Sequence, residues 1–315
     1  MSLIAEKVFL RYNVLRGDRM NINIIEKYRK LAVDNLFEIK SFKTAWGTWK
    51  NNINALIPNK NVNEITELGS SLRDIFFSTN NGRTQATVSA GGRVWEHLVC
   101  WYLNFCSVGS RTVIVRPIAK ILPVVVRDAI TVNYGNFISN TEADLVAITF
   151  PEIYDNSFDN ITDEKQIVHH INNLISYHFN EIEISIIQCK TNWNDNAQIP
   201  MLWDMIYKVR VFEENNISVG RNNYSIKDCR RFTYAFATVP TISLDKFKSN
   251  SVAVKRVANL SGGIFWGNSS RTGVALSLSE LPAKLFFTNQ DYNMRRDLTP
   301  LMKTYDTNFI YFKLN

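Results

Sequence analysis

The sequence predicts a single α/β domain with helical decoration at its N-terminus, and three observations support this fold class. The 315 residues are 45% hydrophobic and 21% charged, an ordinary composition for a globular protein. Residues 1–80 are mostly helical in pattern, and β-branched runs follow from residue 112. No linker rich in Pro, Gly or Ser separates the two parts. We therefore expect one domain over residues 1–315, made of a helical region (1–80), a core (90–240) and a looser basic C-terminal region (241–315).

The N-terminal third predicts helices separated by a polar loop. Amphipathic spacing indicates helices over residues 26–39 and 63–77. Residues 78–93 are polar and contain glycine, which is typical of a loop. Residues 94–105 are apolar on nearly every side except at Glu96 and His97, so we expect a central, buried helix there.

The second half alternates between strand and helix patterns. Runs rich in β-branched residues predict strands over residues 112–118, 121–132, 143–150, 181–190 and 230–240. Helical spacing predicts helices over residues 163–179 and 199–214. A polar turn is expected directly after Lys190.

Several functional classes have no support in the sequence. The four cysteines form no C-x-x-C pair, which argues against a zinc knuckle or a dense disulfide framework. There is no P-loop, no G-x-S-x-G and no H-E-x-x-H motif. The N-terminus lacks a signal-peptide pattern, and no apolar run is long enough to span a membrane. We expect a soluble protein of a reducing compartment.

Two strand ends carry the residues that predict chemistry. Side chains alternate along a strand, so Gln188 and Lys190 share one face, while Cys189 points to the other. Glu142 and Asp144 share a face of their strand in the same way. If the strands are neighbours, a carboxylate, an amide oxygen and an ammonium group meet at one end of a sheet. Such a cluster can hold Mg²⁺ and leave the lysine to position a water.

With these residues in place, residues 90–239 resemble the PD-(D/E)XK nucleases, and more narrowly the type II restriction endonucleases. The resemblance implies a mixed central sheet flanked by helices. It also implies that Asp144 and Gln188 bind the metal, that Lys190 serves the water, and that Glu96 completes the acidic cluster. One departure is that the family usually has Glu or Asp where this chain has Gln188. Charge is then expected from Asp144, Glu96 and Glu142.

Each residue also has a simpler interpretation. Glu96 could pair with Arg93 or His97, because a carboxylate in an apolar helix needs a partner. Asp144 could cap a turn, and Lys190 could be a charge that protects an edge strand from aggregation. The three histidines of the predicted helix 163–179 lack zinc-site spacing and are expected to be ordinary surface or core residues.

A net charge of +7 and polar, basic loops indicate a polyanionic partner. Basic and amide side chains can contact phosphates and read base edges. The candidate DNA-binding residues are Arg83, Gln85, Asn192, Asn194, Arg221, Arg230, Arg231, Lys255 and Arg256.

The sequence therefore predicts a Mg²⁺-dependent endonuclease that cuts double-stranded DNA at specific sites. We expect a homodimer in the cytoplasm of a prokaryote, paired with a cognate DNA methyltransferase. One alternative is a monomeric repair or nicking nuclease on the same scaffold. The other is a DNA-binding protein that has lost catalysis through Gln188.

Overall fold

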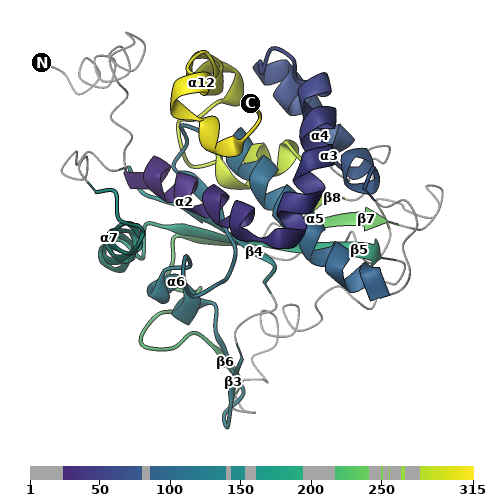
Figure 1. Ribbon diagram of the computed structural model, residues 1–315. Helices are drawn as coiled ribbons and strands as arrows, with labels where there is room; N and C mark the ends of the chain where they lie inside the picture. Colours follow the sequence, from purple (N-terminus) through teal and green to yellow (C-terminus); the bar gives the residue numbers. More distant parts are fainter. Residues whose placement is uncertain are drawn as a thin grey trace, which may run out of the picture.

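The structure, a computed structural model, describes residues 24–79, 86–139, 143–152, 161–193, 217–240, 250, 255, 264–266 and 277–315 (Figure 1). The predicted helix over residues 199–214 lies outside these ranges. Within them, no helix combines the length and hydropathy needed to cross a membrane.

A mixed sheet forms the centre of the described part of the chain. Its five strands lie in the order β1 (Thr112–Val115), β4 (Leu145–Thr149), β5 (Glu183–Trp193), β7 (Arg231–Pro240) and β8 (Ile264–Trp266). Strands β1, β4 and β5 are antiparallel neighbours, whereas β7 and β8 run parallel to β5. Strand β4 therefore begins at the end of the sheet where β5 and β7 finish. We call this the Lys190 end of the sheet.

Helices cover both faces of this sheet, which confirms the predicted α/β class (Figure 1). On one face, Ile187 and Cys189 lie in a buried cluster with α5 (Ala86–Cys106). On the other face, Ile184 and Ile186 are buried together with residues of α7 (Glu164–Tyr177). The expected alternation along residues 181–190 is therefore present, with Cys189 turned toward α5.

Among the described residues, three further helices come before α5, and they agree with the helical pattern of the N-terminal region. They are α2 (Ile24–Glu38), α3 (Lys40–Leu56) and α4 (Val62–Phe77). Asn61 caps α4: its side chain accepts a hydrogen bond from the backbone N–H of Glu64, and the Glu64 carboxylate accepts one from the backbone N–H of Asn61. Helix α5 begins at Ala86, so the predicted loop over residues 78–93 is wrong from that residue onward.

The strand predicted over residues 121–132 is also wrong, because half of it forms α6 (Val124–Ala129). Pro123 precedes the helix and can start one, since its ring fixes the backbone angle and its missing N–H is not needed there. The backbone N–H of Val125 donates to the Asn172 side chain of α7, and Val125 and Val126 are buried. Tertiary packing therefore overrides the strand preference of the valines.

A second, smaller sheet projects from the molecule beneath α6 (Figure 1). It contains β2 (Val132–Asn133), β3 (Ile138–Ser139) and β6 (Ser218–Val219) in the order β3-β2-β6, all antiparallel. We call residues 132–139, which form β2, β3 and the turn between them, the projecting hairpin.

Residues 277–315, the described end of the region 241–315 that we expected to be looser, are packed against the helices. Their short helices are η3 (Pro282–Phe286), η4 (Met294–Leu298), α11 (Thr299–Met302), α12 (Tyr305–Asn308) and η5 (Ile310–Phe312). Phe286 and Phe312 are buried in the same cluster as α3, α4 and α5. Trp101 of α5 donates a hydrogen bond to the backbone oxygen of Phe312.

Candidate functional site

The start of β4 and the end of β5 bring Asp144 beside the Gln-x-Lys segment. The β4–β5 ladder ends at the pair Leu145 and Ile187. Directly beyond it, Oδ2 of Asp144 accepts a hydrogen bond from the backbone N–H of Cys189 at 2.7 Å. The carboxylate of Asp144 therefore contacts the strand between Gln188 and Lys190. This contact fixes its position at the Lys190 end of the sheet.

Gln188 has an unusual environment within the described residues. Its side chain is only 1% exposed, yet its Oε1 atom accepts no hydrogen bond from any described residue. A buried acceptor without a partner costs about 1–3 kcal/mol. Lys190, two residues further along the same face, is half-buried. The amide oxygen is thus available for a ligand at this end of the sheet.

Glu96 reaches the same cluster from α5. Burial raises the pKa of its carboxyl group from 4.5 to about 7, and the negative charge of Asp144 contributes to this shift in the same direction. The positive charges of Lys190, Arg116 and Arg93 act in the opposite direction. The charges of Asp144 and Lys190, which the sequence analysis selected, therefore lie near enough to act on the Glu96 carboxyl.

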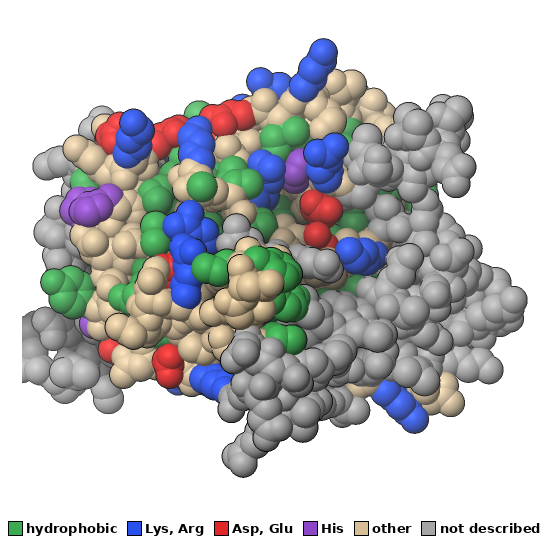
Figure 2. Space-filling model, turned by 90° about the horizontal axis from the view of Figure 1, so that it is seen from below, with side chains coloured by type: hydrophobic (Ala, Val, Ile, Leu, Met, Phe, Trp, Pro, Cys, Tyr) green, Lys and Arg blue, Asp and Glu red, His purple; other side chains and the backbone are tan. Residues whose placement is uncertain are grey.

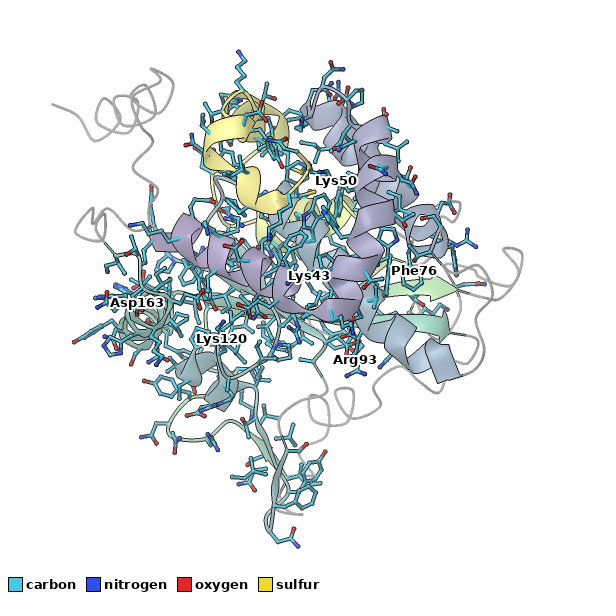
Figure 3. All side chains as sticks on the ribbon, viewed as in Figure 1. Lys43, Lys50, Phe76, Arg93, Lys120 and Asp163 are labelled. Atoms are coloured by element: carbon cyan, nitrogen blue, oxygen red, sulfur yellow. The ribbon has the colours of Figure 1, made fainter. Side chains whose placement is uncertain are left out.

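Two arginines, Arg93 and Arg116, lie near this cluster. Arg116 was not selected from the sequence. Arg116 follows β1 directly, at the same end of the sheet, and donates a hydrogen bond to the Asn35 side chain of α2 at 3.1 Å. It lies within the strand predicted over residues 112–118, and its charge in that otherwise apolar run was the available signal. Arg93 is exposed on α5, one turn before Glu96, beside the lower part of that helix in Figure 3. Figure 2 shows acidic side chains in a hollow with basic side chains around them.

His97 follows Glu96 but is a core residue. It is buried against the ring of Phe42, with ring centroids 6.0 Å apart. Burial lowers the pKa of its imidazole to about 3, and the charges of Arg116 and Arg93 add to that effect. His97 is therefore neutral at physiological pH, and it does not neutralise Glu96 as one simpler interpretation would require.

The predicted DNA-binding residues do not all lie near the cluster. Arg230 and Arg231 are at the start of β7, where both lie within 4 Å of the Glu183 carboxylate. Glu183 begins β5, so they are about 23 Å from Lys190 along the strand. Arg221 pairs with Asp128 at 2.7 Å, and Lys255 is exposed. The remaining predicted residues, or their side chains, lie outside the described part: Arg83, Gln85, Glu142, Asn192, Asn194 and Arg256.

The donor atoms at this end of the sheet suit a hard divalent cation. Mg²⁺ prefers oxygen ligands, and Glu96, Asp144 and Gln188 offer two carboxylates and an amide oxygen. A cation would stabilise the ionised form of Glu96, which burial disfavours, and it would give the buried oxygen of Gln188 a partner. Within the described residues, no group of three or more His, Cys, Asp or Glu side chains is arranged for a metal. The amide oxygen of Gln188 is the further donor that this end of the sheet offers beside the two carboxylates.

A pocket of about 350 Å³ lies elsewhere, between α2, the start of α7 and the C-terminal helices. Its walls include Leu31, Ile167 and Phe309, together with acidic and basic side chains of α2. None of the residues at the Lys190 end of the sheet lines it. The candidate site is therefore identified by its chemistry and is separate from this pocket.

These features define a mixed α/β protein with an acidic, amide-containing cluster at one end of its sheet. The chain matches no protein-family model and no curated protein sequence.

Proposed function

We propose that this protein is a Mg²⁺-dependent endonuclease that hydrolyses phosphodiester bonds of double-stranded DNA. The observation that carries the proposal is the approach of Glu96, Asp144, Gln188 and Lys190 at one end of the sheet, with a buried amide oxygen that lacks a partner among the described residues. Two carboxylates and an amide suit a metal, and the surrounding lysine and arginines suit a phosphate anion.

The order of elements also supports a PD-(D/E)XK core. A helix with an acidic residue is followed by antiparallel β1, β4 and β5 and then by β7 parallel to β5. The Asp precedes β4, and the Gln-x-Lys segment lies within β5. The resemblance stated above implies a mixed central sheet flanked by helices, and the mixed sheet with α5 on one face and α7 on the other agrees with it.

The residues divide the work of hydrolysis between metal binding and positioning. Asp144, Glu96 and the Gln188 oxygen would hold Mg²⁺, which supplies charge neutralisation on the phosphate and lowers the pKa of water. Lys190 would orient the attacking water in line with the leaving oxygen. Arg116, whose charge acts on Glu96, would stabilise the negative charge that develops on the phosphate.

The partners follow from this activity. Cutting both strands at a symmetric sequence requires two sites related by a two-fold axis, so we propose a homodimer. A restriction enzyme also needs a cognate DNA methyltransferase to protect the host DNA, and we propose this pairing in a prokaryotic cytoplasm. A methyltransferase gene beside the gene for this chain would separate restriction from repair or nicking.

The direct test is digestion of a mapped closed-circular plasmid with Mg²⁺ or with EDTA, followed by sequencing of the ends. Asp144→Asn should abolish cleavage. The matched control is Asp306→Asn, which changes an exposed aspartate of α12 on the opposite side of the molecule in Figure 1. Discrete ends from the wild type and the control, and intact plasmid with Asp144→Asn, support the proposal. Cleavage by Asp144→Asn at the wild-type rate refutes the site.

Gln188 favours one second candidate, a protein that binds DNA without cutting it. An amide in place of a carboxylate removes one negative charge that a metal would use. In that case the plasmid stays intact with Mg²⁺, but it migrates more slowly in a native gel when protein is added. The same preparation therefore distinguishes the two functions.

A further inference from the structure

The projecting hairpin exposes apolar side chains at its end. Phe137 is 57% exposed and Ile138 is 53% exposed, and they are adjacent in the chain. Residues 129–139 contain no charged side chain. Large apolar groups that protrude together into water often mark a site of interaction.

The turn of the hairpin is locally ordered by its own contacts. The rings of Tyr134 and Phe137 are stacked, with centroids 4.7 Å apart and planes 9° from parallel. The backbone N–H of Tyr134 donates to the oxygen of Phe137 at 2.9 Å. Gly135 has a φ of 80°, which glycine adopts without strain, and its N–H donates to the Asn133 side chain. Phe137 is therefore held in a defined orientation.

The base of the hairpin is fixed by a buried carboxylate. Asp128 of α6 accepts hydrogen bonds from Arg221 at 2.7 Å and from the Asn222 side chain at 2.8 Å. The N–H of Gly220 donates to the oxygen of Thr131, next to β2. These contacts tie the hairpin to α6 and to the segment after β6. The projecting hairpin is thus a supported element that presents its apolar end outward.

The hairpin lies close to the candidate site. Ser139 ends β3, and Asp144 follows only five residues later, so their Cα atoms are at most about 18 Å apart. Figure 1 shows the hairpin projecting downward, and Figure 2, which looks at the molecule from below, shows the hollow with acidic and basic side chains on that side. Arg127 and Arg221 lie at its base beside the single carboxylate of Asp128, so the base carries a net positive charge that suits the phosphates of a polyanion.

We propose that the projecting hairpin is a DNA wedge, in which Phe137 and Ile138 insert between base pairs near the phosphate that is cut. This inference rests on the proposed function and adds to it a second contact with the same DNA. Apolar side chains that enter a base step partly unstack it and bend the duplex. Counted from Phe137, the chain to Asp144 reaches at most about 25 Å, which at about 3.4 Å per base pair places the insertion within about seven base pairs of the cut.

The test measures duplex unwinding, which needs no knowledge of the recognition sequence. Closed-circular plasmid is relaxed by a metal-independent topoisomerase in EDTA, with Asp144→Asn protein bound to prevent cleavage. After the protein is removed, the change in linking number reports insertion into the duplex. The variants combine Asp144→Asn with Phe137→Ser and Ile138→Ser, or with Phe137→Trp. The matched control is Tyr177→Ser, which removes an aromatic of α7 that is 86% exposed.

We expect the double serine variant to lose the change in linking number and to bind plasmid about tenfold more weakly, because stacking on a base is lost. Phe137→Trp should keep both, and Tyr177→Ser should change neither. Equal unwinding by the double serine variant overturns the wedge, while the proposed function stands if wild-type protein still cleaves. If the double serine variant binds DNA as well as the parent protein but has a lower molecular mass in light scattering, the hairpin contacts a second copy of the chain instead of DNA. A wild type that neither binds nor cuts DNA removes both proposals.

Discussion

Replacing Glu96 by glutamine should make the metal-free protein more stable at pH 8. In the folded chain, burial and the charge of Asp144 raise the pKa of the Glu96 carboxyl from 4.5 to about 7. At pH 8 the carboxylate is therefore charged in an environment that disfavours its charge. The Glu96→Gln substitution keeps the shape of the side chain and removes only that charge.

The size of the effect follows from the linkage between protonation and folding. A folded pKa above the unfolded value means that the folded state holds the proton longer, so stability falls as pH rises from about 4.5 to about 7. At 1.36 kcal/mol per pH unit the full difference is about 3 kcal/mol, and screening of the half-buried Glu96 by solvent reduces it to about 1–2 kcal/mol. Below pH 4.5 the Glu96 carboxyl is protonated in both the folded and the unfolded state. The charge then no longer makes the wild type less stable than Glu96→Gln.

The assay is urea unfolding of the wild type and Glu96→Gln at pH 5 and pH 8, with EDTA or with Mg²⁺. The wild type should lose stability relative to the variant between the two pH values in EDTA, and Mg²⁺ should restore it. Glu38→Gln is the control, because hydrogen bonding to Lys120 lowers the pKa of Glu38 instead. If Glu96→Gln is less stable than the wild type at pH 8 in EDTA, the electrostatic account of the cluster is wrong.

Three further predictions concern the other members of the cluster. Asp144→Ala should abolish plasmid cleavage and leave DNA binding in a gel-shift assay within a few-fold of wild type, because it removes a ligand at the sheet end. Lys190→Ala should lower the single-turnover cleavage rate by about 10² or more, and Lys190→Arg should restore little of it, since a planar guanidinium differs in shape from an ammonium group. Gln188→Glu should reduce the Mg²⁺ concentration that gives half-maximal cleavage, because a carboxylate attracts the cation more strongly than an amide. If this concentration is the same in the wild type, Gln188→Glu and Gln188→Ala, Gln188 does not bind the metal.

The approach of Asp144 to the end of β5 could be predicted from the sequence because it depends on simple periodicity. Alternation along residues 181–190 puts Cys189 toward the core and Lys190 on the opposite face. Antiparallel pairing then brings the start of one strand to the end of its neighbour. The alternation needs no knowledge of distant contacts, whereas the pairing of β4 with β5, on which the prediction was conditional, is supplied by the structure.

Other features depend on tertiary contacts that local patterns do not contain. The valines before Ala129 favour a strand, but α7 supplies a surface on which they are buried as a helix. Gly69 weakens the helical pattern of α4, yet the structure requires it. A Cβ atom there would collide with the hydroxyl groups of Tyr102 and Ser277. Arg116 was missed because its approach to Glu96 joins β1 to α5 across the fold.

The electrostatics of Glu96 also give a physical reason for the amide at position 188. Glu96 already has a pKa near 7 with one carboxylate, Asp144, beside it. A glutamate at position 188, where the side chain is almost fully buried, would add a second negative charge and would disfavour the ionised forms of all three groups. Gln188 keeps an oxygen donor at this position without that repulsion. The metal-free protein is then expected to be more stable but to attract a cation less strongly, so under the proposed function it would need more Mg²⁺ than a variant with glutamate at this position.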